Sequence, residues 1–98
     1  MLVEIYLTTA NPPEMYTNGV IQDANGVEVA ANVRATVAQG APIVDLRNGK
    51  YAYIFNASCS GSLTVACKNP TTGTVLGGPK AFNTTALQLG RVFNFKVP

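Results

Sequence analysis

Histidine and tryptophan are absent from this 98-residue chain, and cysteine occurs only twice. Without histidine, the chain lacks the base that most often activates a catalytic serine or cysteine, and also the commonest nitrogen ligand of zinc. The two cysteines, Cys59 and Cys67, are too few to form a structural zinc site by themselves. These absences argue against an enzyme and against a bound metal, and no motif in the chain indicates another cofactor.

Charged residues are also scarce, at 12% of the chain against about 25% in typical soluble proteins. One explanation is that part of the surface faces another protein, because interface cores are depleted in charge. The other explanation is a surface made of serine, threonine, asparagine and glutamine. The composition leaves both explanations open.

The charges that are present form no cluster in the sequence. Seven basic residues give a net charge of +2 but are scattered, whereas binding to phosphate backbones needs several neighbouring cations, so no nucleic-acid partner is expected. The five acidic residues are equally dispersed, and no active-site motif joins any two of them. They are Glu4, Glu14, Asp23, Glu28 and Asp45.

Long hydrophobic runs are missing too. No stretch approaches the roughly 18 apolar residues of a membrane span, so no membrane partner is expected. Residues 2–7 alternate, include Glu4 and follow no cationic segment, which does not fit a signal peptide. The expectation is a protein that is made in the cytoplasm and is not secreted by a signal peptide.

What the sequence does contain is an alternation of apolar and polar residues, which is typical of strands with one buried face. Apolar residues alternate with polar ones over residues 2–8, 27–37 and 87–97. In the second of these segments every odd position is apolar and is therefore expected to be buried. These positions are Val27, Val29, Ala31, Val33, Ala35 and Val37.

Turn signals separate the apolar segments every 8–12 residues or so, which favours a β-sandwich or small barrel. Asn18-Gly19 and Asn48-Gly49 suit tight turns, and Gly77-Gly78-Pro79 is expected to be a bend between strands. The stretch from Asp23 to Glu28 faintly suggests a calcium loop, but a hairpin turn fits it better. The sequence therefore predicts one domain, residues 1–98, folded as an all-β antiparallel sandwich of seven to nine strands.

The two cysteines lie in a predicted hairpin with a loop at residues 60–62. In this register Phe55 faces Cys67, and Cys59 lies about four residues along the ladder from Cys67, roughly 13 Å away. A disulfide requires Cα atoms within about 7 Å, so both thiols are expected to be free. Cys67 is expected to be a small core residue, whereas Cys59 near the bend can be exposed.

Several of these segments resemble part of an immunoglobulin-like repeat. The matching residues run through Gly49, Tyr51, Tyr53 and Phe55, then Gly61, Leu63, Val65 and Cys67, then Gly77, Gly78, Pro79 and Phe82. In these positions the chain is similar to the filamin or bacterial Ig type over about half its length, and it departs from that pattern at Lys80-Ala81. The resemblance implies an Ig-like sandwich and implies no chemistry.

The segment at residues 8–19 is the candidate interface loop, because it carries Met15 and Tyr16 where a plain connector would be polar. Pro12 and Pro13 stiffen it and prevent it from pairing as a central strand. The alternative is that Met15 and Tyr16 cap the end of the core, which is favoured because long loops often pack on their own domain.

The function expected from these features is non-catalytic. The length, the Met1 start without a secretion signal and the low charge suggest a virion accessory protein, such as a bacteriophage capsid decoration or cement protein. Its partner would be a capsid or other virion protein, and it can form a homo-oligomer. Two alternatives stay open. One is an adhesion or carbohydrate-binding module that uses Tyr6, Tyr16, Tyr51 and Tyr53 for stacking, and the other is a small inhibitor of a host enzyme.

Overall fold

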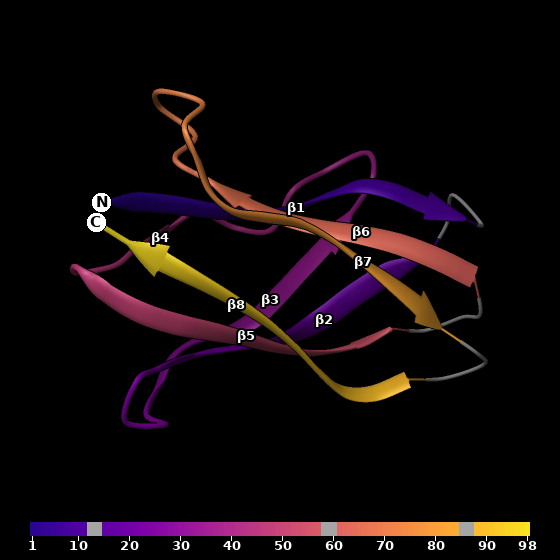
Figure 1. Cartoon of the computed structure of the whole chain (residues 1–98), viewed down its shortest axis with the longest axis horizontal. Coiled ribbons are helices and arrows are strands. Elements are labelled where there is room, and N and C mark those ends of the chain that lie inside the picture. The colour runs from indigo at the N-terminus through magenta and orange to yellow at the C-terminus, as the bar shows by residue number, and fades with distance from the viewer. Residues whose placement is uncertain (12–14, 58–60, 85–87) are drawn as a thin grey trace.

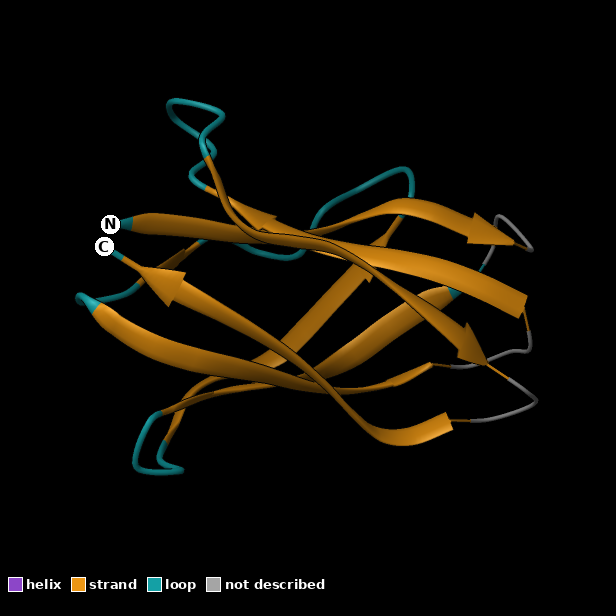
Figure 2. Ribbon diagram, viewed as in Figure 1, coloured by secondary structure: helices purple, strands orange, loops and turns teal. Residues whose placement is uncertain are grey.

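The computed structural model describes residues 1–11, 15–57, 61–84 and 88–98. These residues form eight β-strands and contain no helix, and hence none long and apolar enough to cross a membrane (Figure 2). The strands are β1 (Leu2–Asn11), β2 (Tyr16–Asp23), β3 (Glu28–Thr36), β4 (Val44–Asp45), β5 (Gly49–Ala57), β6 (Gly61–Lys68), β7 (Val75–Thr84) and β8 (Gln88–Val97).

The strands form two antiparallel sheets that face each other. The first sheet has the order β4-β1-β6-β7, and the second has the order β3-β2-β5-β8. The two sheets form the layers of one sandwich, and both chain ends lie at the same end of it (Figure 1). The prediction of an all-β antiparallel sandwich with seven to nine strands is confirmed.

The core lies between the sheets and is built from alternate positions of every long strand, as expected for half-buried strands. The second sheet contributes most of the aromatic rings, and Tyr53 stacks on Phe55 with ring centroids 4.9 Å apart. Phe82 of the first sheet meets Phe55 edge to face at 5.3 Å and so joins the two layers.

A hydrogen-bond network lies inside this apolar core. The Tyr53 hydroxyl is fully buried and donates to the Val33 carbonyl oxygen at 2.6 Å. Because that bond uses the only hydroxyl proton of Tyr53, the Thr17 hydroxyl donates to the Tyr53 oxygen, at 2.9 Å. The network connects β5 to β2 and β3, and each of its polar groups would be costly to bury unpaired.

The turn at residues 23–27 is a hairpin turn, as predicted in preference to a calcium loop. One carboxylate oxygen of Asp23 accepts the backbone N–H groups of Asn25 and Val27, at 2.9 and 3.0 Å. Gly26 takes a positive φ of 78°, which glycine adopts without strain. The Asp23 carboxylate thus stabilises the connection from β2 to β3.

The predicted hairpin between residues 53 and 67 is wrong. β5 belongs to the second sheet and β6 to the first, so Phe55 pairs with Gly19 and Arg91, while Cys67 pairs with Ile5. The residues expected on one apolar face do point into the core, but they do so from opposite sheets. Alternation shows which side of a strand is buried, and it does not show which strand lies beside it.

Two predicted turns lie inside strands instead. Gly19 is in the middle of β2, where a Cβ would collide with the backbone of Ile54 and come 2.6 Å from the Phe55 Cα. The glycine is therefore needed for close approach of β5 and not for a turn. The expected bend at Gly77-Gly78-Pro79 is a bulge within β7, where the Gly78–Pro79 bond is cis.

The prediction that odd positions of residues 27–37 are buried holds only for part of β3. Val33 and Ala35 are buried, but Val27 is 56% exposed. Val27 lies in the turn before β3, and within β3 the alternation is broken at Asn32, which has a φ of 56° and lies in a bulge where β3 has one residue more than β2. A bulge reverses the alternation of inward and outward side chains. Ala30, on the far side of the bulge from Val33, therefore packs against the core although its position is even.

Cys67 is a buried free thiol, as predicted, and burial raises its pKa to about 12. It behaves as a small core side chain with little nucleophilic thiolate at neutral pH. Cys59 lies outside the described residues.

The Tyr53 network predicts how stability depends on alkaline pH. Burial raises the pKa of Tyr53 to about 12, partly offset by the hydrogen bond from Thr17, against an ordinary value of 10.0. Because the pKa of Tyr53 is higher in the folded state, the contribution of its hydrogen-bond network to the free energy of unfolding is complete below pH 10. This contribution is lost as the pH rises toward 12. We expect Tyr53→Phe to lower the free energy of unfolding by about 1–3 kcal/mol and to flatten its decline across this range. Urea unfolding at several pH values measures both effects, and an equally steep decline in the variant would contradict the assignment.

The close approach of β5 to Gly19 predicts that one added methyl group strongly lowers the stability of the fold. Gly19→Ala should destabilise the protein by more than about 2 kcal/mol, because the new methyl group meets backbone atoms of β5 that cannot move aside. Gly73→Ala is the control, since a Cβ there meets nothing within 4 Å and only the positive φ of 76° is unfavourable. Thermal unfolding compares the two variants, and equal losses would show that close approach at Gly19 is not the constraint.

Candidate functional site

The candidate interface loop is only partly described. Pro12 and Pro13 lie outside the described residues. The Met15 side chain is fully buried in the core cluster, so it does not contribute to the surface of the chain. Tyr16 begins β2, is half-buried, and has the Arg34 guanidinium 4.0 Å above its ring. A role of this segment in binding stays a prediction.

The outer face of the second sheet carries a more extensive apolar feature. Val20 of β2 pairs with Ile54 of β5, and Ile54 pairs with Val92 of β8. Their neighbours Ile21, Tyr53 and Phe93 point into the core, so these three side chains point away from it. Val92 is 40% exposed, and Val20 and Ile54 are half-buried. We call Val20, Ile54 and Val92 the apolar row.

Amide side chains flank the apolar row on both sides. Asn18 pairs with Asn56 on one side, and Gln22 and Asn94 pair with Ala52 on the other. The Asn56 side chain accepts the N–H of Gly90 at 3.0 Å, which holds it in place. An apolar centre with a neutral polar surround matches the usual anatomy of a protein-binding surface.

The charges on this face lie at its margins and are mostly positive. Arg34 is the partner of Asn18 at one margin, and Lys50 pairs with Lys96 at the other. Glu28, the partner of Gln22, is the one acidic residue on this face among those that the structure describes. We call the apolar row, its amide neighbours and these marginal charges the outer face of the second sheet.

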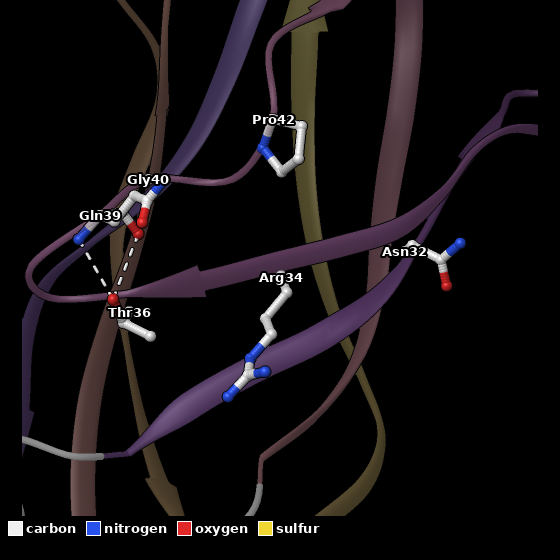
Figure 3. Close-up of a pocket in the computed structure, with 6 residues that line it drawn as sticks. All are labelled: Asn32, Arg34, Thr36, Gln39, Gly40 and Pro42. Atoms are coloured by element: carbon white, nitrogen blue, oxygen red, sulfur yellow. Dashed lines mark hydrogen bonds between the residues drawn. The ribbon is translucent and has the colours of Figure 1, made fainter.

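A polar crevice adjoins this face at the edge strand β3 (Figure 3). It has a volume of about 300 Å³ and lies beside the connection from β3 toward β4. The Thr36 hydroxyl accepts the N–H of Gln39, and the N–H of Ala41 donates to the Ile5 carbonyl oxygen at 2.8 Å, which fixes the connection. The crevice is lined by Asn32, Arg34, Thr36, Gln39, Gly40 and Pro42. Among the residues that the structure describes, no carboxylate or thiol is part of this lining.

The acidic side chains elsewhere are held apart in structural contacts. Glu4 lies 3.6 Å from the Lys68 ammonium, and Asp45 lies 3.0 Å from the Met1 ammonium. Asp23 is engaged in its hairpin turn. Among the described residues, no three histidine, cysteine, aspartate or glutamate side chains come together to hold a metal ion.

The four tyrosines do not form a shared stacking platform. Tyr51 and Tyr53 are buried in the core, where Tyr51 stacks on Phe95. Tyr6 lies on β1 with the Lys68 ammonium over its ring, whereas Tyr16 lies on β2 in the opposite sheet. The feature that suggested carbohydrate binding is therefore not present on any one face.

Comparison of the chain with protein-family models, with curated proteins and with solved structures finds no match. The resemblance to filamin or bacterial Ig repeats therefore stays a prediction.

Sequence reasoning missed the apolar row. The one available signal was Ile54, an aliphatic residue at an outward position of a strand. Val20 and Val92 join it only through the order β2-β5-β8, which alternation does not reveal.

The tyrosine environments predict a chemical modification pattern. Brief treatment of the folded protein with tetranitromethane should nitrate Tyr6 and Tyr16, which are half-buried, and spare Tyr51 and Tyr53. Peptide mass spectrometry reads each site, and the same reaction in denaturant should label all four. Nitration of Tyr53 in the folded protein at the rate of Tyr16 would contradict the buried network.

Proposed function

We propose that this chain is a non-catalytic structural protein that binds another protein through the outer face of its second sheet. The observation that carries the proposal is the apolar row. Its three aliphatic side chains lie side by side at outward positions, which polar residues usually occupy in a strand with one buried face. The neighbouring residues are mostly amides, so the centre of this face carries no charged side chain. The cores of protein-binding surfaces are depleted in charge in the same way.

The specific role we propose is that of a virion accessory protein, such as a bacteriophage capsid decoration or cement protein. A small sandwich whose outer face has an uncharged centre suits attachment to the outside of a shell, because strands that are already ordered lose little entropy on binding. The marginal positive charges would fix its orientation on an oppositely charged partner.

The proposal predicts association with assembled virus shells. The chain should sediment with purified particles and be released as the shells are disrupted. Absence of the chain from purified particles would contradict the virion role.

A matched pair of variants tests which face binds. Ile54→Lys places a charge in the apolar row, and we expect it to weaken association with shells at least about tenfold. Thr64→Lys is the control, because Thr64 is also half-buried but lies on β6, in the first sheet. Sedimentation with shells at increasing protein concentration measures both affinities. Equal affinities would show that the outer face of the second sheet is not the binding surface.

A further inference from the structure

Lys50 and Lys96 are an unusual pair. They are direct partners across β5 and β8 and point to the same side, an arrangement that is unfavourable for like charges. Several other cations of the chain are engaged: Lys68 lies near Glu4, and Arg34 lies over the Tyr16 ring. Within the described residues, no ion pair or aromatic ring engages Lys50 or Lys96.

Both lysines line a crevice of about 350 Å³. Its lining also includes Leu76 of β7, which is half-buried, whereas the Tyr51 and Phe95 rings behind it are buried in the core and stack with centroids 5.7 Å apart. The Tyr51 hydroxyl donates to the Arg47 carbonyl oxygen at 2.8 Å, which holds the ring in place.

Gly77 lets the two edge strands close the base of this crevice. A Cβ on Gly77 would lie 2.7 Å from the Phe95 Cβ, so β7 approaches β8 here only because the side chain is absent. No carboxylate is among the described residues that line the crevice. Two ammonium groups without an ion-pair partner, beside the apolar side chain of Leu76, are complementary to a carboxylate carried next to an apolar group.

We propose that this crevice binds a glutamate or aspartate next to an aromatic or aliphatic residue, presented by a segment of the protein partner. The identification of the source rests on the proposed function, because Lys50 and Lys96 form one margin of the outer face of the second sheet. The carboxylate lies between the two ammonium groups and relieves their repulsion. The adjacent apolar side chain contacts Leu76.

Two short peptides test this site directly. The first is acetyl-Gly-Phe-Glu-Leu-Gly-amide, and the second replaces its glutamate with glutamine. Titration of the isotope-labelled protein, followed by amide NMR signals, should show shifts at Lys50, Phe95 and Lys96 with the first peptide. The second peptide should bind roughly five- to tenfold more weakly, since each exposed ion pair contributes about 0.2–1 kcal/mol.

Lysine variants supply the matched controls. Lys50→Gln with Lys96→Gln should weaken binding of the glutamate peptide by a similar factor, and both side chains are exposed, so the fold is retained. Lys80→Gln removes one lysine charge from β7, outside the crevice, and should leave binding unchanged. Equal binding of the two peptides, absence of binding, or an equal effect of Lys80→Gln would overturn the proposal.

A free acid distinguishes the source of the carboxylate. 3-Phenylpropanoate should bind more weakly than the glutamate peptide, and equal or tighter binding would overturn the assignment to a protein segment. The peptide titration does not depend on shell association. A loss of shell association with peptide binding retained would therefore count against the proposed function alone.

Discussion

The buried hydroxyl of Tyr53 is the constraint on which the second sheet depends. It lies in an apolar core, where it must be hydrogen-bonded, and its two partners come from β2 and β3. Satisfying it fixes the position of β5 relative to both strands. The same register places Val20 beside Ile54 on the opposite side of the sheet. The packing inside the sandwich and the apolar row outside it are therefore two consequences of one alignment.

That alignment gives the two faces of the second sheet different roles. The inner face is aromatic and closes on Phe82 of the first sheet, so its side chains are committed to folding. The outer face carries aliphatic and amide side chains that the fold does not need to bury, with unpaired lysines at one margin. A chain with so few charges has little else on its surface to orient a partner, which is why we assign binding to this face.

The sequence was sufficient to predict the fold class and several strands, because alternation and turn residues are local signals. Residues 2–8 lie in β1 and residues 88–97 form β8 as the alternation predicts, and the turn at Asp23 follows from its side chain. The neighbours of each strand were not predictable, because alternation shows only which side of a strand is buried. The apolar residues of β5 and β6 pack into the same core from opposite sheets, although the alternation fits a hairpin equally well. Gly19 was misinterpreted because a glycine required for close approach looks like a glycine in a turn. The candidate binding face was missed for the related reason that it exists only across three strands.

Amide hydrogen exchange of two single variants at adjacent positions tests this account most directly. Tyr53→Phe should accelerate exchange throughout β2, β3 and β5, because it removes the group that ties these strands together. Ile54→Lys should leave exchange in those strands close to that of the unmodified protein, because its side chain faces outward. If Ile54→Lys accelerates exchange as much as Tyr53→Phe does, the apolar row is part of the folding core, and the division of roles between the two faces is wrong.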